Sequence, residues 1–212
     1  MSTGPQAALI GDAVGSRGAS DRVRLHARIN AALEAVNTEL RPSVPLRITV
    51  GDEYQGVFAH VGEAVSAALR LRLLLQPEHD VRHGIGWGRI TVLSDEPRVE
   101  DGPGWWAARE AIEAVAHDQQ HAQPHLRTAY RLADDQDGPD PAALNAALIA
   151  RDGLLGAASP RSLGVLRGLL AGMSQTQIAT AEAVSPSAIS QRVRRDGLSA
   201  LVACDRLLAE VR

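Results

Sequence analysis

The chain has 212 residues, of which 45% are hydrophobic and 22% charged, as is ordinary for a globular protein. Its length suits one large domain with a smaller unit. A single cysteine, Cys204, excludes an intrachain disulfide, and no cysteine and histidine cluster has structural-zinc spacing. The N-terminal segment does not resemble a signal peptide, and no run of about 20 apolar residues occurs. We therefore expect a cytoplasmic protein without a membrane partner.

The charged residues are unevenly distributed along the chain. All 22 basic residues are arginine. Residues 1–150 have a net balance of -6, whereas residues 151–212 have a balance of +3. A basic tail on an acidic body indicates that the tail meets a polyanion, although chance can also produce such an imbalance.

The predicted elements alternate between strands and helices over the first two thirds of the chain. The apolar run at 6–14 predicts a buried strand, and Ser20 predicts the N-cap of a helix over 21–38 whose apolar face includes Val23. Further elements are predicted as a hairpin at 45–60, a helix at 61–75, glycine-broken strands within 81–93, a helix at 104–117 and a strand at 126–132. This order is typical of an α+β fold with a mostly antiparallel sheet.

Only helices are predicted beyond this point. Asp140 and Pro141 predict the N-cap and first turn of a helix over 141–156. We therefore divide the chain into an α+β domain at 1–138, a connecting helix or linker at 139–159, and a small all-helical domain at 160–212.

Residues 175–194 have the pattern of a helix-turn-helix. Such a unit needs a small residue where its helices cross and a buried aliphatic residue in the turn, and Ala179 and Val184 meet these needs. Ser185 and Pro186 predict the N-cap and first position of the second helix.

The outer face of that second helix carries polar side chains of the types that reach base edges and phosphates in a major groove. They are Ser187, Ser190, Gln191, Arg194 and Arg195. The stretch resembles the helix-turn-helix of phage repressors and the last region of sigma factors, which implies DNA as the partner. We expect a homodimer, because one such unit binds only a half-site. A helical hairpin that only packs or dimerises is the alternative.

Carboxylates mark two predicted strand ends in the first domain. Asp12 ends the first strand in ALIGDAVGSR, and Asp52 and Glu53 lie at the hairpin tip in TVGDEYQGVF. A pair of this kind suits Mg²⁺, which takes one or two carboxylates plus substrate phosphates. The glycines of RHGIGWGRI would allow phosphates to approach the backbone closely. The alternative is that both aspartates only cap turns.

These motifs, in this order over residues 7–113, resemble class III nucleotidyl cyclases, and GDEY resembles the GGDEF diguanylate cyclases. The resemblance implies a cyclase-like (ferredoxin-type) fold in which Asp12 and Asp52 hold magnesium, with Glu53 as a further acidic candidate. It also implies that Arg109 contacts the phosphates of a nucleotide. Trp105 stands where these cyclases have a catalytic Asn, so we do not expect a functional cyclase.

Three segments together, ALIGDAVGSR, VGDEYQGVF and DGPGWWAARE, resemble the SatD family over nearly the full length. We predict a DNA-binding transcriptional regulator whose cyclase-like domain senses a nucleotide, with magnesium as a possible cofactor. A nucleotide-processing enzyme with an accessory helix-turn-helix is the first alternative. A DNA-binding scaffold with a degenerate first domain is the second.

Overall fold

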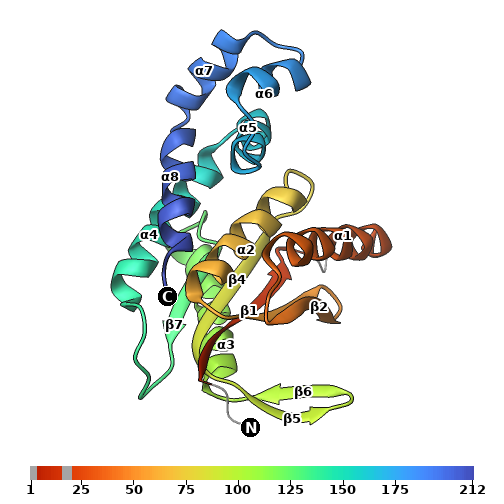
Figure 1. Ribbon diagram of the computed structural model, residues 1–212, viewed down its shortest axis with the longest axis vertical. Coiled ribbons are helices and arrows are strands. Elements are labelled where there is room, and N and C mark those ends of the chain that lie inside the picture. The colour runs from red at the N-terminus through yellow and green to blue at the C-terminus, as the bar shows by residue number, and fades with distance from the viewer. Residues whose placement is uncertain (1–3, 16–20) are drawn as a thin grey trace.

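The computed structural model describes residues 4–15 and 21–212, and its centre is a five-stranded sheet (Figure 1). The strand order is β2-β3-β1-β4-β7. Three strand pairs are antiparallel and β4 pairs with β7 in parallel, so the sheet is mixed and mostly antiparallel, as predicted. The strands are β1 (Pro5–Ala13), β2 (Val44–Val50), β3 (Glu53–Phe58), β4 (Val81–Arg89) and β7 (Thr128–Leu132). A separate hairpin of β5 (Thr91–Asp95) and β6 (Arg98–Asp101) projects from the body.

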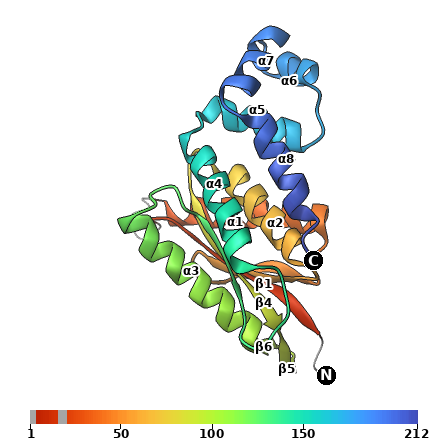
Figure 2. The ribbon, with the colours of Figure 1, turned by 90° about the vertical axis from the view of Figure 1, so that its left-hand side faces the viewer.

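Helices cover both faces of the sheet (Figure 2). Ala7 and Leu9 of β1 face a core formed with α1 (Arg22–Leu40) and α2 (Val61–Leu75). The alternate residues Ala8 and Ile10 face α3 (Pro103–His121) on the other side. The C-terminal third consists of α4 (Pro141–Ala157), α5 (Pro160–Leu170), α6 (Gln175–Ala181), α7 (Pro186–Arg195) and α8 (Leu198–Ala209). None of the helices in the described ranges has the length and apolarity needed to cross a bilayer.

The start of α1 differs from the prediction. Ser20 lies outside the described residues, and the N-cap is Asp21, whose side chain accepts from the Arg24 amide at 2.8 Å. Val23 is 82% exposed, so its predicted place on the apolar face is wrong. It lies two residues before the buried Leu25, and a step of two residues points to the opposite side of a helix.

Glycines at every second position of β4 create a bare face. Successive side chains on a strand point to opposite sides, so Gly84, Gly86 and Gly88 leave one side without side chains. The backbone of α3 lies directly on it: a Cβ atom at Gly86 would be 2.2 Å from the carbonyl oxygen of Gly104. The expectation that these glycines admit phosphates is therefore wrong, because they meet a helix, and β4 runs through them unbroken.

Side chains of helix α4 form hydrogen bonds with the backbone groups along the free edge of β7. Asn145 accepts from the Tyr130 amide and donates to the Tyr130 carbonyl, both at 2.9 Å. Seven residues further along the same helix, Asp152 accepts from the amides of Arg127 at 2.8 Å and Thr128 at 2.7 Å. Two side chains thus supply the bonds that a sixth strand would have made, and they protect this edge from pairing with another chain.

The C-terminal helices share a core with the sheet-covering helices. Leu69 and Leu73 of α2 belong to the same buried cluster as Leu166 of α5 and Leu201 of α8. The amide of Gly62 also donates to the Val211 carbonyl at 2.9 Å. The predicted divisions after residues 138 and 159 fall next to the N-caps of α4 and α5, and a separate C-terminal domain stays a prediction.

Gly86→Ala should destabilise the protein by about 3 kcal/mol or more, because its Cβ would overlap the α3 backbone, which cannot rotate away. Gly153→Ala is the matched control. Nothing lies within 4 Å of a Cβ there, and alanine is the better helix former. Urea unfolding of both variants measures the difference. Equal stability of the two variants would contradict the direct packing of α3 on β4.

Candidate functional site

The end of β1 and the tip of the β2–β3 hairpin border an open cavity of about 550 Å³. Because β1 and β3 are antiparallel, the end of β1 meets the start of β3, with Gly11 opposite Tyr54. Gly51 adopts a left-handed φ of 64° that closes the hairpin turn. The lining residues are Asp12, Ala13, Gly15, Val50, Asp52, Glu53 and Arg82.

Asp52 fastens the hairpin tip to β1. Its Oδ2 accepts from the backbone amide of Ala13 at 3.0 Å. This bond brings Asp52 beside Asp12, as the sequence predicted for the two strand ends. Asp52 thus makes a structural hydrogen bond, and its remaining carboxylate oxygen has no hydrogen bond to the described part of the chain.

Asp12 has a partner that the sequence analysis missed. Arg82 lies directly opposite it in the β1–β4 register and donates to its two oxygens at 2.6 and 2.9 Å. Burial raises the pKa of Asp12, Arg82 opposes this effect, and the nearby negative charges of Asp52 and Glu53 add to the rise. Asp52 and Glu53 therefore repel Asp12, and a cation beside Asp12 would relieve that repulsion.

Glu53 and Arg109 form an ion pair with each other. The Arg109 guanidinium, on α3, donates to both Glu53 oxygens at 2.8 Å. These hydrogen bonds raise the pKa of Arg109. The predicted acidic ligand and the predicted phosphate contact are thus close together, but in this structure they neutralise one another at the edge of the cavity.

The carboxylates of the cavity could coordinate magnesium only if a bound ligand supplied further oxygen atoms. Among the described residues, no group of three or more histidine, cysteine, aspartate or glutamate side chains is placed to hold a metal ion. Asp12 and Asp52 remain as a two-carboxylate set. Magnesium accepts such a set when phosphate oxygens and water complete its shell.

Trp105 does not contribute to the cavity. It is 8% exposed and packs in the core under α3 with Ala8, Ile10 and Ile112. The position where class III cyclases have their Asn therefore carries a packing residue. Its neighbour Trp106 is 58% exposed and donates from Nε1 to Asp101 at 2.8 Å.

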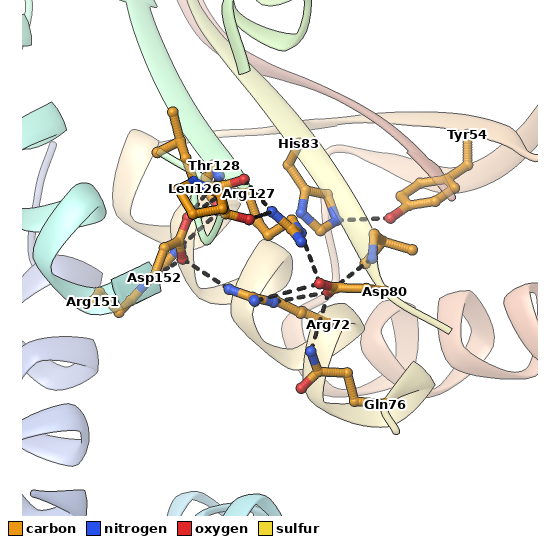
Figure 3. A network of polar contacts seen from close by, with 12 residues as sticks. Tyr54, Arg72, Gln76, Asp80, His83, Leu126, Arg127, Thr128, Arg151 and Asp152 are labelled. Carbon is orange, nitrogen blue, oxygen red and sulfur yellow. Dashed lines mark hydrogen bonds and ion pairs between the residues drawn. The ribbon is translucent and has the colours of Figure 1, made fainter. Parts of the chain in front are cut away.

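A buried polar network lies behind the cavity (Figure 3). The Tyr54 hydroxyl and His83 Nε2 are 2.7 Å apart, and both residues are fully buried. The Tyr54 ring occupies the space beside Gly11, where a Cβ would be 2.4 Å from the ring. Gly11 is therefore required next to Asp12 because a buried tyrosine lies under this part of the strand.

Charged groups continue the network from His83 toward α4. Asp80 accepts from Arg72 at 2.9 Å and from Arg127 at 2.7 Å. Asp152 accepts from Arg72 and from Arg151, both at 3.3 Å. Burial disfavours the Asp80 carboxylate, but the two arginines outweigh that effect and its pKa is lowered. None of these five residues was singled out from the sequence, because no local pattern connects them.

A short turn joins helices α6 and α7. Ala183 has a left-handed φ of 53°, and Ser185 caps α7 by accepting from the Ala188 amide. Ala179 is buried where the helices meet, as predicted. Val184 is 44% exposed, so its predicted burial is wrong; Ile178 fills the core beside the turn instead.

The outer face of α7 carries the predicted polar residues. Ile189 and Val193 are 1% and 3% exposed and anchor the helix. Ser187, Gln191, Arg194 and Arg195 are exposed and Ser190 is half-buried. Arg195 forms an ion pair with Asp196 at 2.7 Å, whereas Arg194 has no ion pair within the described residues.

The family model of the SatD family matches residues 6–208. The chain belongs to the SatD family. No curated protein matches the chain.

Several solved structures similar to this SatD-family chain are nucleotidyl cyclase domains. The guanylyl cyclase domain of the RhoGC fusion protein from Blastocladiella emersonii is 16% identical, with a TM-score of 0.47 over 53% of this chain and 77% of that chain. A bacterial light-regulated adenylyl cyclase is 13% identical, with a TM-score of 0.49 over 61% of this chain and 44% of that chain.

His83 should make the protein less stable in mild acid. Burial, together with the charges of Arg151 and Arg72, lowers its pKa from 6.5 to about 3. Between these values the unfolded chain binds one more proton than the folded chain, so stability falls as the pH drops below 6.5. The slope from this residue is about 1.4 kcal/mol per pH unit.

Urea unfolding from pH 7.5 to 5 tests this effect. His83→Gln should remove the slope that His83 contributes, whereas His117→Gln should keep it, because the His117 side chain is 70% exposed. Identical pH profiles for wild type and His83→Gln would show that His83 is not held neutral.

Proposed function

We propose that the Asp12–Asp52 cavity binds the phosphates of a nucleotide together with Mg²⁺. The observation that carries the proposal is that these two carboxylates, 40 positions apart in the sequence, line one open cavity, where Asp52 is fixed by the Ala13 amide. Burial is the main cause of the raised pKa of Asp12, the negative charges of Asp52 and Glu53 add to it, and a divalent cation would relieve their repulsion. The resemblance of the strand-end motifs to class III cyclases supports the same ligand.

The arginines supply the counter-charge for phosphate. Arg82 lines the cavity, and its bidentate bond to Asp12 would be exchanged for phosphate oxygens once magnesium takes that carboxylate. Arg109 is 45% exposed at its side chain and is held near the cavity by Glu53. Both guanidiniums are thus positioned by carboxylates before a ligand arrives.

The residues around the cavity support binding of a nucleotide and do not support its cyclisation. With Trp105 in the core, no side chain from that position can orient a ribose hydroxyl or a phosphate in the cavity. The site is therefore proposed as a nucleotide-binding or nucleotide-processing site related to the cyclases.

Asp52→Asn should abolish the stabilisation of the protein by magnesium with a nucleoside triphosphate. The asparagine oxygen can still accept from the Ala13 amide, so the hairpin remains attached, but the negative charge that attracts the cation is lost. Thermal melts of wild type should rise with both ligands present, by mass action, and those of the variant should not.

The matched control is Asp95→Asn, an exposed aspartate in the β5–β6 hairpin, which should respond as wild type does. A panel of purine and pyrimidine triphosphates, each with and without magnesium, identifies the base. An absence of any ligand-dependent shift in wild type would leave Asp12 and Asp52 as turn-capping residues.

A second proposed function is DNA binding by α6 and α7, and a specific feature of α7 favours it. Two buried residues, Ile189 and Val193, fix its inner face, and its outer face exposes Gln191 and Arg194. Side chains of these types contact base edges and phosphates. A homodimer would bring two α7 helices to adjacent half-sites and give a DNA-binding regulator.

Gln191→Ala should weaken binding to a preferred DNA duplex by about 1–3 kcal/mol and relax its sequence preference, if Gln191 reads a base. The duplex would be selected from a random pool with the full chain and measured by electrophoretic shift. Gln136→Ala, in the loop before α4, is the control. Unchanged affinity and unchanged preference in Gln191→Ala would count against this face.

A further inference from the structure

The last turns of α3 carry two exposed histidines on one face. His117 and His121 are four residues apart, a spacing that makes side chains neighbours on a helix. Their rings are stacked, with centroids 4.5 Å apart and planes inclined by 21°. They lie at the opposite end of α3 from Trp105 and outside the set of residues that line the Asp12–Asp52 cavity.

Both rings have their Nδ1 atoms already engaged. His117 Nδ1 is 3.1 Å from an Asp118 carboxylate oxygen, and His121 Nδ1 is 2.7 Å from the His117 carbonyl oxygen. A carbonyl or carboxylate oxygen only accepts, so each Nδ1 carries the proton. In the neutral rings the lone pair is therefore on Nε2, and neither Nε2 has a hydrogen bond to another described residue.

We propose that His117 and His121 form a two-histidine binding site for a divalent transition metal of the zinc and copper class. Metal-binding histidines commonly donate their second nitrogen to a carboxylate or a backbone carbonyl, which fixes the tautomer and the ring orientation. Here both kinds of partner are present, one for each ring. The proposed site has two protein ligands. Metal-binding groups of three or more such side chains are absent from the described residues.

Chelation requires the two stacked rings to turn toward each other, because a metal lies in the plane of each imidazole ring that binds it. Zinc–nitrogen distances of about 2.0–2.1 Å require the two Nε2 atoms to be roughly 3 Å apart. Both side chains are exposed, so rotation about their side-chain bonds can bring the two Nε2 atoms from the stacked arrangement to one metal ion. Water or groups from another molecule would fill the remaining metal positions. Imidazole nitrogens suit zinc, copper and nickel, whereas magnesium prefers oxygen, so this site is chemically distinct from the carboxylate cavity.

Titration calorimetry of the untagged full chain with Zn²⁺, in excess Mg²⁺, tests the proposal. One ion per chain should bind, and either His117→Gln or His121→Gln should reduce the affinity at least about tenfold, because a chelate becomes a single ligand. Asp118→Asn should reduce the affinity by about tenfold, since it weakens the bond that orients His117.

Two controls separate this site from others. His26→Gln removes an exposed helical histidine whose Nε2 is already 3.0 Å from Asn30, and it should leave zinc binding unchanged. Asp52→Asn should also leave it unchanged, so a failure of the magnesium site and a failure of this site are distinguishable. Zinc binding that persists in both His117→Gln and His121→Gln, or that never saturates in wild type, would overturn the proposal.

Discussion

The pairing of two carboxylates, half-buried Asp80 and fully buried Asp152, with arginines is the constraint on which much of this structure depends. Asp152 is fully buried, and an unpaired charge at such a position costs several kcal/mol. Arg72 pairs with both aspartates, and it comes from α2, whereas Asp80 precedes β4 and Asp152 lies on α4. The three segments must therefore come together in one arrangement for the network in Figure 3 to be satisfied. That requirement places α4 beside the edge of β7, where Asp152 also accepts from two backbone amides.

The same network positions the proposed nucleotide cavity. With Asp80 fixed at the start of β4, strand β4 lies beside β1 in the register that puts Arg82 opposite Asp12. On the next residue, His83 points to the other side of the sheet and contacts Tyr54, under Gly11. Buried Tyr54 and His83 thus lie beneath the cavity, and Asp12 is held at its edge by Arg82. A ligand that takes the Asp12 carboxylate must replace this ion pair with its own contacts to Arg82.

The proposed DNA-binding helices and α2 are connected by packed side chains. Leu69 and Leu73 of α2 share a core with α5 and α8, and Asp205 of α8 accepts from Ser66 of α2 at 3.2 Å. Since α7 is anchored in that core by Ile189 and Val193, a shift of α2 would be transmitted to it through direct contacts. Interior packing transmits such displacements because interiors are close-packed.

The sequence alone determined the features that depend on neighbouring residues. Helix α2 over 61–75, the hairpin that carries Asp52, and the caps Asp140 and Ser185 all follow from periodicity and from local hydrogen bonds between positions a few residues apart. Only the tertiary structure decided the pairing of Asp12 with Arg82, the contact of the β4 glycines with α3 and the exposure of Val184. Each of these depends on which distant segment packs against the residue. The pattern of one segment shows that one of its faces is apolar, bare or charged. Which segment packs against that face is decided by strand register and by buried ion pairs, and these depend on residues far apart in the sequence.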